Sequence, residues 1–222
     1  LMGGDSPERE ISLLSGNAVT RALKDAGVDV IAFDLAERPL CDLVSLGVER
    51  VFIALHGRQG EDGTVQGGLN LLGIPYTGSG VLASALSMDK YRTKVLWRAM
   101  GLPTPDAVRI TSASDADEVI LTLGLPLIIK PNDGGSALGL TKVTDKSEFW
   151  AAYDKARVQG NAVLAEAYVP GAEYTAAILN DVVLPLVRIE APDGNYDYEH
   201  KYFSNETRYV CPSELDAAIE NE

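Results

Sequence analysis

Along the first 80 positions, segments in which apolar residues recur every three to four positions alternate with short continuous apolar runs. Four apolar residues recur every three to four positions and predict a helix that begins at Ser6-Pro7 and ends at Gly27. These residues are Ile11, Leu14, Ala18 and Ala22. A second helix is predicted over 64–72, and short apolar runs predict strands at 28–33, 50–55 and 74–76. Alternating strands and helices are typical of a parallel sheet with helices on both faces.

From position 80 the pattern becomes that of a small α+β domain followed by a polar segment. Helices are predicted at 80–88, 89–100, 114–123 and 146–158, and strands at 107–110, 125–130, 138–143 and 162–169. Two further runs, 174–179 and 182–189, predict a hairpin that turns at Asn180-Asp181. The polar segment 190–212 is rich in tyrosine, which argues against disorder, and loops of this length usually have a function. We interpret it as a lid.

The segment 127–139, LIIKPNDGGSALG, combines an apolar run with a lysine and a glycine-rich loop. The apolar run predicts a buried strand, and Lys130 lies at its end. Gly134 and Gly135 allow the backbone to approach a ligand closely, while a lysine supplies positive charge for phosphate. The Walker form is excluded because no Gly-Lys-Ser/Thr follows. On the residues alone, a nucleotide-binding loop and a plain strand–turn–strand hairpin explain this segment equally well.

Composition and charge narrow the partners of the protein. The 222 residues are 46% hydrophobic, which is enough for one large domain or two to three small ones. The chain carries a formal net charge of −13. Because an acidic chain binds nucleic acids and anionic membranes poorly, we expect neither as a partner. The apolar runs are too short for a membrane span. Cys41 and Cys211 lack metal-ligand spacing and indicate free thiols in a reducing, cytoplasmic location.

Both ends of the chain have the pattern of interrupted elements. Residues 1–4 resemble the end of a strand running into a glycine turn, and residues 213–222 resemble the first turns of a helix. We therefore expect flanking sequence on both sides, with this chain a fragment.

Three long motifs resemble those of the D-alanine–D-alanine ligase family, which belongs to the ATP-grasp superfamily. They are HGRQGEDGTVQGGLNLLGIPYTGSGVLASALSMDKYRTK, KPNDGGSALG and YDYEHKYFSNETRYVCP. The resemblance extends from Gly3-Gly4 to Pro212, in the order of the family. It implies an α/β ATP-grasp fold and a homodimer. The implied domains are an N-terminal parallel-sheet substrate domain at 1–80, a central α+β lid domain at 81–168, and a partial C-terminal domain at 169–222 with a lid loop at about 191–212.

The same resemblance implies an ATP site made of three lysines and an adenosine pocket. Lys90, Lys130 and Lys201 would bind phosphates, with Lys201 acting from the lid. The adenosine pocket would consist of Glu166, Tyr168, Val169 and Glu173. There the adenine amino group would donate to the glutamate at 166, the tyrosine and the valine backbone would contact the ring, and the glutamate at 173 would hold the ribose. From the residues alone, a solvated surface lysine is the simpler explanation of position 90, and the family match reverses that preference.

Four residues match the family's amino-acid site. Glu8 would pair with the substrate ammonium and connect through Ser136 to Tyr202 in the lid. This tyrosine favours an amine nucleophile over a hydroxy acid. His56 would lie near the second substrate in a supporting role. A carboxylate in a first helical turn is also favoured by the helix dipole, so a structural and a functional explanation of Glu8 are equally good on sequence alone.

The implied reaction joins two D-alanines with ATP and Mg²⁺. The γ-phosphoryl group would move to the first carboxylate, and the second amine would displace phosphate from the acyl phosphate. The family's metal ligands are expected beyond Glu222, because Glu214, Asp216, Glu220 and Glu222 lack the motif context. We therefore expect residues 1–222 alone to be catalytically incomplete.

Three alternatives stay open or are set aside. A related carboxylate–amine ligase could use a different amino acid, although the Lys-Tyr pair of the lid argues against it. A nucleotide-binding domain without catalysis would also match a chain that lacks the metal ligands. A dinucleotide-binding domain is set aside because the chain lacks the spaced three-glycine fingerprint.

Overall fold

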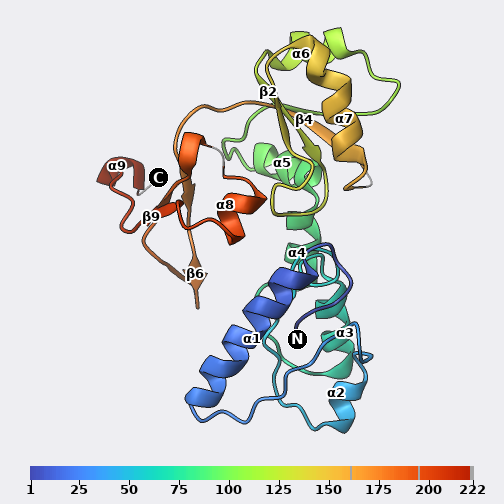
Figure 1. The fold of residues 1–222 in the computed structure, drawn as a ribbon, viewed down its shortest axis with the longest axis vertical. Coiled ribbons are helices and arrows are strands. Elements are labelled where there is room, and N and C mark those ends of the chain that lie inside the picture. Colours follow the sequence, from blue (N-terminus) through green and yellow to red (C-terminus); the bar gives the residue numbers. More distant parts are fainter. Residues whose placement is uncertain (161, 195, 221–222) are drawn as a thin grey trace. The chain divides into compact units, whose positions relative to one another are not determined.

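A computed structural model describes residues 1–160, 162–194 and 196–220 of the chain (Figure 1). The chain divides into two compact units. The first comprises Leu1–Thr104, Asn132–Gly135 and Gly160–Ala162, and the second Pro105–Pro131, Ser136–Gln159 and Val163–Glu222. Each unit has its own hydrophobic core. Within the described ranges, no helix combines the length and apolar character needed to cross a membrane.

The first unit consists of helices that pack on extended segments. Its helices are α1 (Arg9–Asp25), α2 (Asp42–Ser45), α3 (Thr64–Leu72), α4 (Val81–Met88) and α5 (Lys90–Ala99). The core joins α2 and α3 to the extended segments through Phe33, Leu43, Val51, Leu55, Val65, Leu69 and Ile74. The helix predicted at 64–72 is confirmed, with Gly73 at its end.

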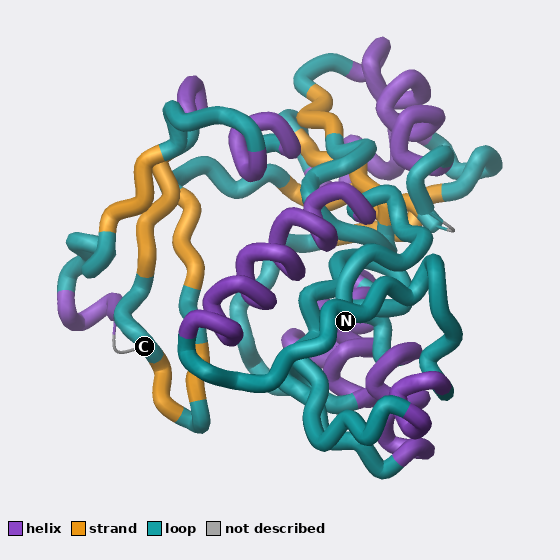
Figure 2. The backbone as a smooth tube through the Cα atoms, turned by 60° about the horizontal axis from the view of Figure 1, so that its bottom comes forward, coloured by secondary structure: helices purple, strands orange, loops and turns teal. Residues whose placement is uncertain are grey.

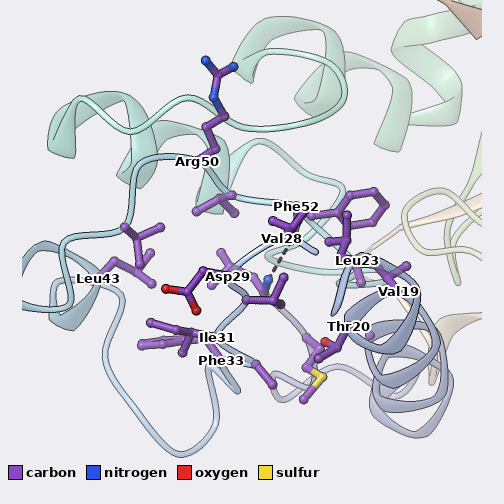
Figure 3. Close-up of a pocket in the computed structure, with 18 of the residues that line it drawn as sticks. Val19, Thr20, Leu23, Val28, Asp29, Ile31, Phe33, Leu43, Arg50 and Phe52 are labelled. Atoms are coloured by element: carbon purple, nitrogen blue, oxygen red, sulfur yellow. Dashed lines mark hydrogen bonds between the residues drawn. The ribbon is translucent and has the colours of Figure 1, made fainter. Parts of the chain in front are cut away.

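The extended segments of this unit pair in parallel, as predicted, but only through isolated bridges. Met2 pairs with Asp34, and Val51 pairs with Tyr76. The strands predicted at 28–33, 50–55 and 74–76 are therefore extended segments rather than continuous ladders. Residues 28–33 also border a cavity, which Figure 3 shows.

This cavity has a volume of about 590 Å³ and an apolar lining. Val19 and Leu23 of α1 form one wall, while Val28, Ile31 and Phe52 come from the extended segments (Figure 3). None of the site residues predicted from the sequence lines it. The cavity is thus a feature of the core of the first unit and is separate from the predicted chemistry.

The turn before α1 is held by a half-buried ion pair. Arg9 donates to both carboxylate oxygens of Asp34, over 2.9 and 2.7 Å, and the Gly4 N–H donates to the same carboxylate over 3.2 Å. A side chain at Gly3 would overlap Asp34, so glycine is required there. The hydrogen bond from Arg9 lowers the pKa of Asp34 to about 2. This pair fixes the path of the chain into the first helix.

The start of α1 differs slightly from the prediction. The helix begins at Arg9, so Glu8 precedes the first turn instead of lying in it. The Ser6 hydroxyl accepts from the Glu8 N–H over 3.2 Å and donates to the His56 carbonyl over 2.8 Å. Ser6 therefore caps a turn that leads into the helix, and the expected dipole effect on Glu8 acts from the N-cap position.

The second unit begins with a four-stranded antiparallel sheet of order β1-β4-β2-β3, which confirms the predicted α+β pattern. Its elements are β1 (Ala107–Ile110), α6 (Ala116–Leu123), β2 (Leu127–Pro131), β3 (Thr141–Val143), η1 (Lys146–Glu148), α7 (Phe149–Arg157) and β4 (Val163–Ala167). Helices α6 and α7 cover one face of the sheet (Figure 1). The core between them includes Leu127, Ile129, Val143 and Phe149, all fully buried.

The remaining elements form a second, smaller sheet and a hairpin. They are β5 (Glu173–Thr175), β6 (Ile178–Leu179), β7 (Val182–Val183), β8 (Val187–Glu190), η2 (Pro192–Gly194), α8 (Tyr198–Tyr202), β9 (Arg208–Val210) and α9 (Ala217–Glu220). Figure 2 shows the strands β5, β8 and β9 side by side in antiparallel order. The hairpin β6–β7 turns at Asn180 and Asp181, which have φ of 48° and 66°, as predicted.

The segment 190–212 is more regular than the predicted polar loop. Asp197 accepts from the His200 N–H and caps α8, and β9 gains its hydrogen bonds from β8. Residue 195 within this segment and residues 221 and 222 of the predicted C-terminal helix lie outside the described residues. Local capping and a partner strand distant in sequence therefore order a segment whose composition alone predicts a loop.

We expect Asp34→Asn to lower the free energy of unfolding of the first unit by roughly 2 kcal/mol near neutral pH. The pKa of Asp34 is about 2 in the folded protein and 3.8 in the unfolded chain, so the ionised carboxylate stabilises the fold above about pH 4. That contribution is lost as the pH falls through about 2, so the wild type and the variant should converge in acid. Urea unfolding at several pH values, followed by Trp97 fluorescence in a Trp150→Phe background, measures it.

Asp29→Asn provides the control, because Asp29 is exposed and, within the described ranges, forms no ion pair with an arginine. A difference between wild type and Asp34→Asn that persists unchanged at pH 2 would contradict this explanation.

Candidate nucleotide and amino-acid sites

The glycine-rich segment is a hairpin, which is one of the two explanations that the sequence left open. β2 and β3 pair in antiparallel fashion, so the segment is a hairpin. Its connection is nevertheless a wide loop, in which Ser136 and Ala137 have φ of 55° and 57°. Non-glycine residues in this left-handed region are uncommon and cluster at functional sites. The loop geometry is therefore compatible with a ligand-binding role for a hairpin connection.

The central strands of the four-stranded sheet separate core residues from polar ones. In β2, Leu127 and Ile129 point into the core under α6 and α7, so Ile128 and Lys130 lie on the opposite face. In β4, Glu166 is paired directly with Ile128 and lies on that same face. We call this surface, with Ile128, Lys130 and Glu166, the polar face of the sheet.

On the polar face, Lys130 and Glu166 form an ion pair. The lysine Nζ lies 2.6 Å from Glu166 Oε2, and the two side chains are only 20% and 13% exposed. Burial of both charges is tolerated because each neutralises the other. The pair places a cation and a hydrogen-bond acceptor side by side. Such a surface can bind a ligand that carries an anion and a polar N–H.

The chain beyond β4 continues along the same face. The Tyr168 N–H donates to the Pro126 carbonyl over 3.4 Å, which extends the pairing past Ala167. The Nζ of Lys142 in β3 lies 3.8 Å from the centroid of the Tyr168 ring. Val169, at 64% exposure, and Glu173, at the start of β5, follow at the surface. The sequence analysis missed Lys142, although strand alternation across the hairpin signals its face.

In the first unit, Lys90 is tied to the start of the glycine-rich loop. Its Nζ donates to the Gly134 carbonyl over 2.6 Å and to the Asn132 carbonyl over 3.4 Å. The buried Asn132 side chain in turn accepts from the Tyr91 N–H over 2.9 Å. Lys90 is thus a loop-bound cation and not a freely solvated lysine. Asn132 is a second residue that the sequence analysis did not identify.

Glu8 lies buried, with 4% exposure, against two glycines of the first unit. A side chain at Gly57 would overlap the Glu8 carboxylate, and the φ of 67° also requires glycine there. Gly135 approaches the same carboxylate closely enough for an ordinary contact with a Cβ. Two glycines therefore leave room around a buried carboxylate that can accept a cationic group.

His56 lies beside a second carboxylate. Its Nε2 is 3.2 Å from the Ser15 hydroxyl, and its Nδ1 is 3.8 Å from Glu61 Oε1. Partial burial raises the pKa of Glu61, the nearby Glu8 charge raises it further, and the hydrogen bond from the Gly57 N–H opposes the rise. Glu61 was not predicted from the sequence, because its place beside His56 is set by the fold.

In the second unit, the structure brings Ser136 and Tyr202 together. Their hydroxyls lie 2.8 Å apart, although 66 positions separate them in the chain. The neighbouring Lys201 of α8 has its Nζ 5.1 Å from the centroid of the Tyr196 ring. The serine–tyrosine contact implied by the sequence resemblance is therefore present, and it anchors α8 to the glycine-rich loop.

The acidic residues of the chain also raise the question of a metal-binding cluster. Throughout the part of the chain that the structure describes, no group of three or more histidine, cysteine, aspartate or glutamate side chains could hold a metal ion. Glu214, Asp216 and Glu220 belong to that part, and Glu222 lies outside the described residues. The donors present thus do not fit a bound Mg²⁺.

Comparison with known proteins agrees with this geometry. Family models described as the D-ala D-ala ligase N-terminus and C-terminus match residues 41–79 and 96–222. The D-alanine–D-alanine ligase of Azoarcus sp. (strain BH72) is 57% identical over 220 residues, which cover 99% of this chain and 72% of that protein. The crystal structure of the Bacillus anthracis D-alanine–D-alanine ligase has a TM-score of 0.82 at 34% identity, over 99% of this chain and 72% of that one. The same enzyme complexed with ATP has a TM-score of 0.81 at 33% identity, over 99% and 71%.

The antiparallel sheet with its glycine-rich hairpin and lysine, together with the likeness to these structures, defines an ATP-grasp ligase fold. Within that class, the chain belongs to the D-alanine–D-alanine ligase family.

We expect Ser136→Ala and Tyr202→Phe each to accelerate amide hydrogen exchange in α8 about fivefold. Each change removes the same hydroxyl–hydroxyl bond, whose net value is on the order of 1 kcal/mol. Because the two residues share one interaction, the double variant should exchange no faster than either single one. Tyr153→Phe on α7 is the control for loss of a tyrosine hydroxyl. Additive effects would show that the two hydroxyls stabilise α8 separately.

Proposed function

We propose that this protein is an ATP-dependent ligase that joins two D-alanines into D-alanyl-D-alanine for peptidoglycan precursors. The observation that carries the proposal is 57% identity to a D-alanine–D-alanine ligase over almost the whole chain. The ion pair of Lys130 and Glu166 on the polar face supports it, because ATP offers both an anion and an amino group.

ATP binds through the residues of the polar face and the lid. Lys130 binds phosphate, and Glu166 accepts from the adenine amino group. Tyr168 and the Val169 backbone contact the base, and Glu173 holds the ribose. These roles are supported by the shared face of the sheet, on which the first two side chains already meet.

Two further lysines complete the phosphate site. Lys90 supports phosphate binding from the start of α5, where its ammonium already meets loop carbonyls. Lys201 acts on the γ-phosphate from α8, next to the tyrosine that is bonded to Ser136. Positive charge from three elements is suited to offset a triphosphate, which is the main requirement of phosphoryl transfer.

The amino acids bind through Glu8, Ser136, Tyr202 and His56. Glu8 pairs with the ammonium of the first D-alanine, and its burial strengthens that pairing. Ser136 and Tyr202, which are hydrogen-bonded to each other, close over the substrate together. His56 lies near the second D-alanine, oriented by Ser15.

The reaction then proceeds in two steps. An oxygen of the first D-alanine carboxylate attacks the γ-phosphorus, and ADP leaves. The amine of the second D-alanine attacks the acyl carbon, loses a proton and expels inorganic phosphate, so a peptide bond replaces the acyl–phosphate bond. The chain's own residues position the reactants, neutralise charge and exclude the water that would hydrolyse the acyl phosphate.

Four further proposals accompany this function. We propose Mg²⁺ as the counter-ion of the nucleotide, but assign no step or ligand to it because the described residues do not fit one. We propose a homodimer, supported by large apolar side chains exposed on the first unit, Leu71 at 91% and Leu82 at 80%. A cytoplasmic location follows from the proposed use of ATP. The division into domains at 1–80, 81–168 and 169–222 is kept as a proposal.

The function is tested on a protein of the relatives' full length, since this chain spans 72% of the Azoarcus ligase. ADP release from ATP and Mg²⁺ is measured in the presence of D-alanine, with D-serine, D-lactate and L-alanine as competing substrates. We expect D-alanine to be preferred as both donor and acceptor. Preference for another acceptor would indicate a related ligase, and ATP binding with no turnover would indicate a nucleotide-binding domain.

We expect Lys130→Met to weaken ATP binding at least tenfold while leaving D-alanine binding within twofold. The change removes a cation from the phosphate site, and Met keeps the length of the side chain. Calorimetric titration with each ligand separately measures both affinities, and Lys146→Met, an exposed lysine paired with Asp117, is the control. Equal losses for ATP and D-alanine would contradict a phosphate role.

A further inference from the structure

Lys142 occupies a position on the polar face that the proposed mechanism does not use. In the register of the sheet, Lys142 of β3 pairs with Ile128 of β2, which pairs in turn with Glu166 of β4. Side chains on directly paired residues share one face, so these three residues form a row across the sheet. Thr141 and Val143, the neighbours of Lys142, face the core side. Lys142 therefore belongs to the same surface as the ion pair.

The contact that Lys142 makes is with an aromatic ring. Its Nζ lies 3.8 Å from the ring centroid of Tyr168, two residues beyond Glu166 along the same strand direction. A lysine at this distance over a ring is a cation–π interaction. In a chain with a net charge of −13, carboxylates are abundant, yet among the described residues Lys142 forms no ion pair. The exposed Lys146 shows the contrast, since it pairs with Asp117 over 2.6 Å.

We propose that Lys142 is a positioning residue of the nucleotide site, which holds the Tyr168 ring in the orientation that receives the adenine base. The proposal rests on the proposed function, because it requires a nucleotide on the polar face. With the ammonium on one side of the ring, Tyr168 keeps one rotamer and its remaining surface is available to the base. The ring is thereby ordered before the ligand arrives, and less conformational freedom is lost on binding.

This role predicts a change in nucleotide affinity without a change in the chemical step. Lys142 lies beside the tyrosine and not beside the residues assigned to the reacting groups, so its loss should raise the KM for ATP and leave kcat unchanged. A cation–π contact at an exposed site is worth up to about a factor of five in binding. Arginine also stacks on aromatic rings, so Lys142→Arg should retain the effect.

The test measures ATP binding by calorimetry in the absence of D-alanine, for the wild type, Lys142→Met, Lys142→Arg and the control Lys146→Met. We expect Lys142→Met to raise the ATP dissociation constant about fivefold, with the other two variants within twofold of the wild type. The KM for ATP should rise in parallel, with kcat and the KM for D-alanine unchanged. Thermal unfolding of each variant verifies that it is folded.

A double-mutant cycle with Tyr168→Leu separates positioning from direct contact. If Lys142 acts through the ring, Lys142→Met should have no further effect on ATP affinity in the Tyr168→Leu background. Additive losses, or unchanged affinity in the single variant, would overturn the inference while leaving ATP binding by the wild type intact. A wild type that binds no ATP would instead overturn the proposed function, and this inference with it.

Discussion

The register of β2 against β4 is the constraint on which the rest of the second unit depends. Because successive side chains of a strand point to opposite faces, this register places Leu127 and Ile129 under the helices and Lys130 and Glu166 together on the other side. A shift by one residue would bury the lysine and expose the leucine. The same apolar packing that stabilises the sheet therefore brings the charged residues of the polar face together.

In the first unit, loops position a buried charge. Arg9 and Asp34 hold the glycine turn, and Ser6 links the start of α1 to the residue 56 carbonyl, so Glu8 is carried into a buried position. Glycine at position 57 leaves the space that its carboxylate needs. Here side-chain hydrogen bonds and small residues position the carboxylate, whereas strand register positions the charges in the second unit. Both arrangements place charges where water has limited access.

The sequence predicted much of the local structure, because local patterns determine it. The strand 107–110, the helix ended by Gly73 and the turn at Asn180 follow from alternation, glycine and turn residues within a few positions. The ion pair between Lys130 and Glu166 could not be predicted, because the pairing of strands 36 positions apart is a tertiary property. Asn132 and Glu61 were not predicted because their contacts also depend on the fold, whereas the face of Lys142 follows from alternation across the β2–β3 hairpin. The strands predicted in the first unit are extended segments joined by isolated parallel bridges, and residues of 28–33 line a cavity.

The pairing of Lys130 with Glu166 also has a consequence for selectivity. A simple anion such as sulfate can engage the lysine only by drawing it from its carboxylate, and it offers that carboxylate no proton donor in exchange. A purine with an exocyclic amine and a phosphate tail satisfies both groups at once. A keto group in place of the amine would face the carboxylate with like polarity. In the proposed site, the pair would therefore favour a ligand that carries both a phosphate and an amine donor over a ligand that carries only one of them.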